Sequence, residues 1–259
     1  MVVSSILTPV VIIGEKYSFR YPVAELVLKT DNDLIIFDTG FPEGDELSDA
    51  LKALSLDPCD FTYVFNTHIH IDHYGKNRIF KNAKNVLSKR DYIFHKNWNE
   101  EFKNSRDRAG FIKAVFPGLS SSQTNRITDM LAAVLRKYAN NGLPLDEHMF
   151  HFIEDNPDIP DYIEILETPG HTPFHVSYMI KGKNRNAVML GDLVPGKRSF
   201  YDGKDNFIEV YSDKEKALKS LDTVKNRARE LGRTVIHPSH DRPFYFDDRS
   251  YLTQRVYEL

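Results

Sequence analysis

Residues 68 to 73 hold four side chains of the types that bind divalent metals. The run reads His-Ile-His-Ile-Asp-His, and its candidate ligands are His68, His70, Asp72 and His73. Imidazole nitrogens and carboxylate oxygens suit zinc and the neighbouring first-row metals. A packed core has little use for polar side chains at this density, because a buried polar group costs free energy unless a partner satisfies it. We therefore interpret the run as a metal-binding cluster.

One cluster of four ligands cannot close two metal sites, so further ligands are expected downstream. Each candidate repeats one design, in which a short apolar run is followed by turn residues and then by a ligand. The candidates are His171 after residues 162–166, Asp192 after residues 188–190, and His237 and His240 after residues 234–236. At this point His237 and His240 compete for the last position.

Buried strands are the elements that must position these ligands. Residues 61–66 are β-branched and aromatic, so they predict a strand that delivers the first cluster to a loop at its end. Before it, we expect an N-terminal strand, paired strands at 23–28 and 33–37, and a helix at 46–56. After it, Gly75 lets the backbone turn before a short helix around 77–80.

Residues 98 to about 148 break the alternation of strands and helices. Apolar side chains at helical spacing over 127–138 predict one helix, with Ser120 and Gln123 as its capping box and Asn-Asn-Gly at 140–142 as its stop. Strands return over 151–180 and 187–190. Ser212 and Glu215 predict the start of another helix, and we expect a short strand at 244–246 and a terminal helix over 249–259.

The ligands, taken in order, resemble the metallo-β-lactamase superfamily in its branch of dinuclear hydrolases. The family pattern is His-x-His-x-Asp-His, then a His, an Asp and a His. The residues that match it are His68, His70, Asp72, His73, His171, Asp192 and His240. The last histidine of the family tends to follow a small residue, which favours His240 after Ser239 over His237. The resemblance covers nearly the whole chain.

This resemblance implies a role for each matching residue. One metal would take His68, His70 and His171, the second would take Asp72, His73 and His240, and Asp192 would bridge them together with a water or hydroxide. Asp192 and Asp72 are thereby the catalytic candidates, with Asp192 holding the hydroxide and relaying a proton to the leaving group. The implied cofactors are two divalent metal ions, with zinc expected and iron or manganese admitted because no ligand is a thiolate.

Asp38 ends the strand-like run at 34–37 and resembles the family residue that orients the metal-binding loop. A plain strand-ending turn acid is the alternative for it. In fold, the resemblance implies an α/β protein built as an αββα sandwich of two sheets flanked by helices, with the ligands along one edge. We expect residues 1–259 to form a single domain of this kind, with a helical insertion at about 98–148 over the active-site side.

The implied reaction is hydrolysis of an ester, a lactone or a thioester by the bridging hydroxide, with phosphotriesters as a further class. Two alternatives stay open, a mononuclear-iron persulfide dioxygenase and a weakly catalytic ligand-binding regulator. Quorum-lactone hydrolases of the family place a tyrosine three residues after the bridging aspartate, where this chain has Pro195. The insertion's aromatic residues either line the active site or pack the insertion onto the body; they are Trp98, Phe102, Phe111, Phe116 and Tyr138. No substrate-binding residue is assigned.

The amino-acid composition limits the kinds of binding partner and the location to expect. The 34 basic and 37 acidic residues leave a formal net charge of −3, which gives no electrostatic reason to expect nucleic acid or an anionic membrane. A single cysteine, Cys59, excludes an internal disulfide and fits a reducing cytoplasm. No apolar run approaches the ~18 residues of a membrane span. We expect a cytoplasmic enzyme with a small-molecule substrate, and leave a homodimer open.

Overall fold

The computed structural model describes residues 1–138, 147–202 and 211–259. Its strands are β1 (Val2–Ile13), β2 (Ser18–Lys29), β3 (Leu34–Phe37), β4 (Tyr63–Phe65), β5 (Lys84–Leu87), β6 (Phe150–Phe152), β7 (Ile163–Glu167), β8 (Val176–Ile180), β9 (Asn186–Gly191), β10 (Thr234–Pro238), β11 (Phe244–Tyr245) and β12 (Val256–Glu258). Its α-helices are α1 (Glu46–Ala53), α2 (Ile71–Tyr74), α3 (Lys89–Asn104), α4 (Arg108–Val115), α5 (Ser121–Tyr138), α6 (Lys197–Asp202) and α7 (Lys214–Leu231). Short 3₁₀ helices are η1 (Pro58–Asp60), η2 (Asn77–Ile79), η3 (Glu147–Met149) and η4 (Ile153–Asp155).

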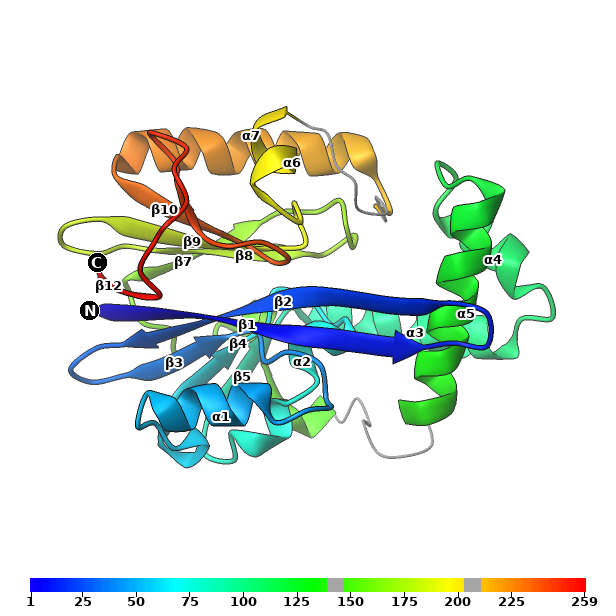
Figure 1. Ribbon diagram of the computed structural model, residues 1–259, viewed down its shortest axis with the longest axis horizontal. Coiled ribbons are helices and arrows are strands. Elements are labelled where there is room, and N and C mark those ends of the chain that lie inside the picture. The colour runs from blue at the N-terminus through cyan, green and yellow to red at the C-terminus, as the bar shows by residue number, and fades with distance from the viewer. Residues whose placement is uncertain (139–146, 203–210) are drawn as a thin grey trace.

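Two sheets lie face to face, with α7 on the outer face of one and α1 on the outer face of the other (Figure 1). The larger sheet has the strand order β12-β1-β2-β3-β4-β5-β6, and the smaller has β11-β10-β9-β8-β7. This mixed arrangement confirms the predicted α/β class and the αββα sandwich. None of the helices in the described ranges is long and apolar enough to cross a bilayer.

Alternation along the strands builds the layers. In β3, the buried side chains of Ile35 and Phe37 belong to the core between the sheets, where Tyr178 of β8 also lies. Ile36, between them, belongs instead to the cluster that contains Leu51 of α1. This period of two is what a strand buried on both faces requires. The inter-sheet core therefore holds one face of β3, and the layer that contains α1 holds the other.

The ligand-bearing loops follow parallel strands. β3, β4 and β5 pair in parallel in the larger sheet, and β9 pairs in parallel with β10 in the smaller. The carboxyl ends of parallel strands meet at one edge of a sheet, which is where ligands gather in open α/β sheets. Asp38 follows β3, the first histidine cluster follows β4, and Asp192 follows β9. The fold therefore gathers these side chains at one edge of the sandwich.

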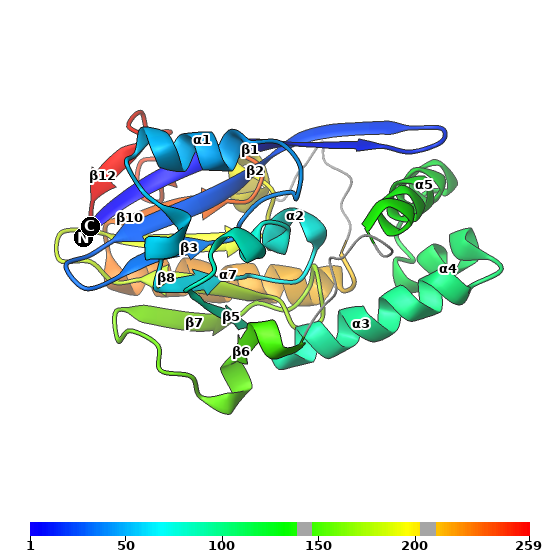
Figure 2. The same ribbon diagram turned by 90° about the horizontal axis from the view of Figure 1, so that it is seen from below.

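A long hairpin and three helices extend beyond this edge. β1 and β2 pair over their whole length and reach out to α5 (Figures 1 and 2). Met130 and Val134 of α5 pack against Val10 and Phe19 of the hairpin. The Asp129 carboxylate accepts the backbone N–H groups of residues 15, 16 and 17, each at 3.0 Å. These contacts tie the hairpin tip to α5.

The helical segment begins earlier than the sequence suggested, because α3 starts at Lys89 and not near residue 98. The predicted capping box is present, with Ser120 N–H donating to Gln123 Oε1 and Gln123 N–H donating to Ser120 Oγ. The predicted stop at 140–142 lies outside the described residues. A single domain with an insertion at about 98–148 stays a prediction.

Two local predictions were wrong. The expected terminal helix over 249–259 is not formed, since Val256–Glu258 is strand β12 and Tyr257 pairs with Val3 of β1. Burying the Tyr257 side chain in the inter-sheet core favours this pairing over a helix. Asp213, and not Ser212, caps α7 by accepting the N–H of Lys216. Long-range pairing with β1 determines the structure of residues 256–258, and the carboxylate of Asp213 determines where α7 begins.

Candidate functional site

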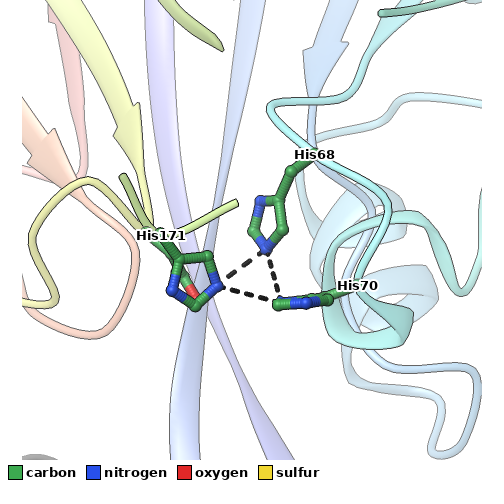
Figure 3. A group of neighbouring side chains, drawn as sticks. His68, His70 and His171 are labelled. Carbon is green, nitrogen blue, oxygen red and sulfur yellow. Dashed lines mark hydrogen bonds and ion pairs between the residues drawn. The ribbon is translucent and has the colours of Figure 1, made fainter. Parts of the chain in front are cut away.

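The seven predicted ligands converge in two groups. The first group is His68, His70, His171 and Asp192, and the second is Asp72, His73 and His240. Within each group the potential ligand atoms all lie within 4.8 Å of one another. Figure 3 shows the side chains of His68, His70 and His171 pointing toward one another.

Three imidazole nitrogens define the first group. His68 Nε2 and His171 Nε2 each lie 2.9 Å from His70 Nδ1. Asp192 Oδ2 is 3.2 Å from His171 Nε2 and 3.9 Å from His68 Nε2. The group therefore presents three nitrogens and one carboxylate oxygen to a common point.

The second group shares Asp192 with the first. Asp192 Oδ1 lies 3.3 Å from His73 Nε2 and 3.3 Å from His240 Nε2. Asp72 Oδ2 is 3.9 Å from His73 Nε2. Asp192 thus turns one oxygen toward each group, which is the geometry of a residue placed between two cations.

Asp38 fixes the tautomer of His73. Its Oδ1 accepts the Thr67 N–H at 2.9 Å, and its Oδ2 accepts both the Thr67 hydroxyl at 2.9 Å and His73 Nδ1–H at 2.8 Å. A carboxylate can only accept, so the proton of a neutral His73 sits on Nδ1 and the lone pair on Nε2. That lone pair faces Asp192.

Thr67 and Pro22 do the same for two further ligands. The Thr67 hydroxyl donates to Asp38, so its oxygen accepts a hydrogen bond from His68 Nδ1–H, 3.0 Å away. The Pro22 carbonyl accepts His240 Nδ1–H at 2.7 Å. When neutral, both rings therefore turn an unprotonated Nε2 into the cluster, as metal ligation requires.

This donor set fits divalent cations. Burial, followed by the neighbouring imidazoles, lowers the pKa of His68 and of His70 well below the ordinary value, so both rings are neutral. His73 Nε2 and Asp192 Oδ1 are buried and have no hydrogen-bond partner among the described residues. Lone pairs that face one another in this way repel unless a cation lies between them. The residues present therefore fit two metal ions.

Buried hydrogen bonds fix the ligand loops. The Asp192 backbone N–H donates to His175 Nε2 at 3.1 Å, and burial lowers the pKa of His175 to about 3, which keeps it an acceptor. Gly191 has a φ of +57°, and a Cβ there would lie 2.6 Å from His175 Nε2. Asp91 accepts the Ile69 N–H and the Thr172 hydroxyl, joining the loops that carry His70 and His171.

Sequence reasoning missed two residues at the cluster. The Tyr21 hydroxyl donates to Asp72 Oδ2 at 3.0 Å, and its ring meets His240 edge-on at 5.1 Å. The buried ring of His95 lies 4.8 Å from that of His70. Neither has a local motif, because each reaches the cluster from a distant element, β2 or α3. His237 lies apart, with Nε2 2.6 Å from Tyr257 Oη.

The cluster opens into a pocket of about 770 Å³ between the hairpin, α3 and α5. The aromatic residues of the helical segment divide between two positions. Trp98, Phe116 and Tyr138 line the pocket, whereas Phe102 and Phe111 do not and belong to the core shared by α3, α4 and α5. Trp98 and Phe116 also pack against this core, and Tyr138 packs edge-on against Phe41 of the body, so lining the pocket and packing are not exclusive for these residues.

Comparison with known proteins agrees with this geometry. A family model described as the metallo-beta-lactamase superfamily matches residues 23–240. An N-acyl homoserine lactonase of a Bacillus species is 23% identical over 247 residues, covering 86% of this chain and 80% of that protein. A probable metallo-hydrolase of Methanocaldococcus jannaschii is 28% identical over 203 residues, covering 78% and 68%.

Solved structures share the fold. AidC, a dizinc quorum-quenching lactonase in complex with a product, superposes with a TM-score of 0.58 at 21% identity, covering 86% of this chain and 74% of that one. At this identity the likeness shows the fold alone.

Proposed function

The chain belongs to the metallo-beta-lactamase superfamily, and we propose that it is a two-metal hydrolase of carboxylic esters, with lactones and thioesters in the same class. One observation carries the proposal: two groups of candidate ligands meet at Asp192 and open into one pocket. Phosphotriesters stay a further class to test. The substrate is a small molecule, and a cytoplasmic location and a homodimer stay predictions.

The proposed ligands divide as the geometry does. His68, His70 and His171 would hold one ion, Asp72, His73 and His240 the other, and Asp192 both. We propose zinc for both sites, because the ligands are imidazoles and carboxylates and the structurally similar AidC is a dizinc enzyme. When bound, two such ions supply a hydroxide at neutral pH and neutralise charge that develops on the substrate oxygen.

Side chains of the protein itself would orient the reacting groups. Burial raises the pKa of Asp192, but His240, His73 and His171 outweigh it and hold that pKa well below its ordinary value, so Asp192 is a carboxylate. Its position, fixed by the bond to His175, suits it to orient the attacking group and accept its proton. The Tyr21 hydroxyl holds Asp72 in place. Apolar side chains of α5, among them Met130 and Val134, would contact the apolar part of a bound substrate.

The alternatives are less well supported. A mononuclear-iron dioxygenase does not need the second ligand group, yet Asp72, His73 and His240 converge as closely as the first. The similar proteins named above are also described as a lactonase or a hydrolase. A regulator without turnover would bind a small molecule and two metals but hydrolyse nothing.

The test is a substrate panel on zinc-, manganese- and iron-loaded protein. The panel holds an aryl ester, an acyl lactone, S-lactoylglutathione and an aryl phosphotriester, each with and without a chelator. We expect a chelator-sensitive rate on an ester or lactone, and a loss of at least ~100-fold in Asp192→Asn. Asp158→Asn, at a carboxylate whose side chain is 90% exposed, is the matched control and should keep the rate. Two bound metals without any turnover would refute the proposal.

A further inference from the structure

The pocket wall outside the metal cluster is basic. Apart from the cluster's Asp72 and Asp192, its charged lining residues are Arg20, Lys96, Lys103, Arg126 and Glu100. Four of these five are cationic. Within the described part of the chain, none of the four forms an ion pair with a carboxylate. A cleft lined by one sign of charge concentrates ligands of the opposite sign.

Arg126 is the most firmly placed of the four. Its guanidinium lies 5.8 Å from the centre of the Tyr17 ring and 5.5 Å from that of Phe19, both in the hairpin. Its Nε is buried and has no hydrogen-bond partner among the described residues. Asp129, one turn along α5, forms no ion pair with it among the described residues, and its oxygens instead accept backbone N–H groups of the hairpin. A buried donor left without an acceptor costs free energy that a ligand would recover.

The basic wall continues well away from the metal ligands. His95, Asn99 and Lys103 line the pocket at helical spacings of four, and the His95 ring contacts that of His70. Eight residues of helix separate His95 from Lys103, which is about 12 Å at the rise of an α-helix. The pocket lining also includes the apolar side chains of Trp98, between these two residues in α3, and Leu131 of α5.

We propose that the substrate is an anion: its reacting ester lies at the metal cluster, and an apolar segment joins it to a carboxylate or phosphate that Arg126 receives. The inference rests on the proposed function and deepens it. Bidentate hydrogen bonds from a guanidinium to a planar or tetrahedral anion are among the strong polar contacts available to a protein. An uncharged ester would leave the Arg126 donor unpaired.

A binding measurement tests this without turnover. Trp98 is the only tryptophan in the chain and lines the pocket, so its fluorescence reports occupancy. The probes are octanesulfonate and octanol, added to the metal-loaded enzyme; sulfonate is a weak ligand for divalent metals. We expect octanesulfonate to bind about tenfold more tightly than octanol. Calorimetry on the same pair gives both affinities independently of the fluorescence.

Arg126→Gln should remove this preference and leave octanol binding unchanged. Arg108→Gln is the matched control, because Arg108 also lies over an aromatic ring, 5.5 Å from the centre of Phe102, and also has a buried Nε without a hydrogen-bond partner among the described residues. Arg108 does not line the pocket. The Arg108→Gln variant should therefore keep the preference for octanesulfonate over octanol.

Equal affinity for the two probes in the unchanged enzyme would overturn the inference, as would equal losses in the two variants. The proposed function fails separately. Protein that binds octanesulfonate through Arg126 but hydrolyses no ester would refute the hydrolase and not the anion site. Ester hydrolysis by the unchanged enzyme, together with the same preference for charged over neutral esters in Arg126→Gln, would refute the anion site alone.

Discussion

Replacing Asp38 with asparagine should disturb both metal sites without touching either one directly. The side chain is fully buried and accepts three hydrogen bonds, two of them from Thr67 and one from His73 Nδ1–H. Asparagine has the same shape and tolerates the positive φ of 55° at this position. Its Oδ1 can keep the Thr67 N–H. Its NH₂ group then lies where Asp38 Oδ2 accepted two hydrogen bonds.

The consequence passes through two tautomers. An NH₂ group opposite His73 Nδ1 needs an acceptor, which moves the ring proton to Nε2 and removes the lone pair from the second ligand group. The same NH₂ donates to the Thr67 hydroxyl, which then donates to His68 Nδ1 and removes the lone pair of the first group. Loss of such an orienting partner costs about 10- to 100-fold in metal affinity, or roughly 1.4 to 2.7 kcal/mol.

The assay is competitive metal titration against a chromophoric chelator, with metal content measured by mass spectrometry. Asp91→Asn is the matched control, because Asp91 is also fully buried and also joins ligand loops. Its partners are the Ile69 N–H and the Thr172 hydroxyl, so no imidazole tautomer depends on it. We expect Asp91→Asn to keep both affinities within about threefold. If Asp38→Asn also keeps them, Asp38 is only a turn residue and the tautomer argument is wrong.

Two further results are expected. His240→Ala should lose the second metal whereas His237→Ala should retain both, because only His240 faces Asp192, and metal analysis showing the reverse would exchange their roles. Burial raises the pKa of Glu25 from 4.5 to about 8. Between about pH 5 and pH 8 the unfolded chain therefore releases a proton that the folded chain keeps, and stability should fall as the pH rises, by up to ~1.4 kcal/mol per pH unit. Glu25→Gln, which keeps the acceptor for the Thr8 hydroxyl, should flatten this fall in urea unfolding, and an unchanged slope would count against the buried neutral acid.

The first ligand cluster and Asp192 could be predicted from sequence because each follows a short, strongly apolar strand. Residues 61–66 mark the end of β4, and the Gly-Asp pair at 191–192 marks the end of β9, so turn chemistry locates the metal ligands without knowledge of the fold. The order of the ligands then indicated the family, and the family indicated the two sheets. Local pattern and fold agree at these positions.

The features that the sequence did not predict depend on contacts between segments far apart in the chain. Strand β12 forms because the edge of β1 pairs with Val256–Glu258. Val256 and Tyr257 favour strands, but three residues are too short a run to predict one without knowledge of that edge. His95 carries no motif, and only the path of α3 brings it to His70. The same holds for the basic wall of the pocket, whose members come from β2, α3 and α5.

The residues that bind metal and the residues that would select the substrate come largely from different parts of the fold. The ligands stand on loops fixed by the central strands, whereas much of the pocket wall comes from α3 and α5. Tyr21 and Pro22 of the hairpin contact the ligands Asp72 and His240, so the hairpin is tied to the metal centre, whereas the wall formed by α5 can change without moving a ligand. The tyrosine that lactone hydrolases of the family place after the bridging aspartate is Pro195 here, and Pro195 lines the pocket. Tyr21 of β2 brings a phenol to the same cluster, with its hydroxyl 3.0 Å from Asp72 Oδ2. The proline at position 195 therefore does not remove lactones from the substrates to be tested.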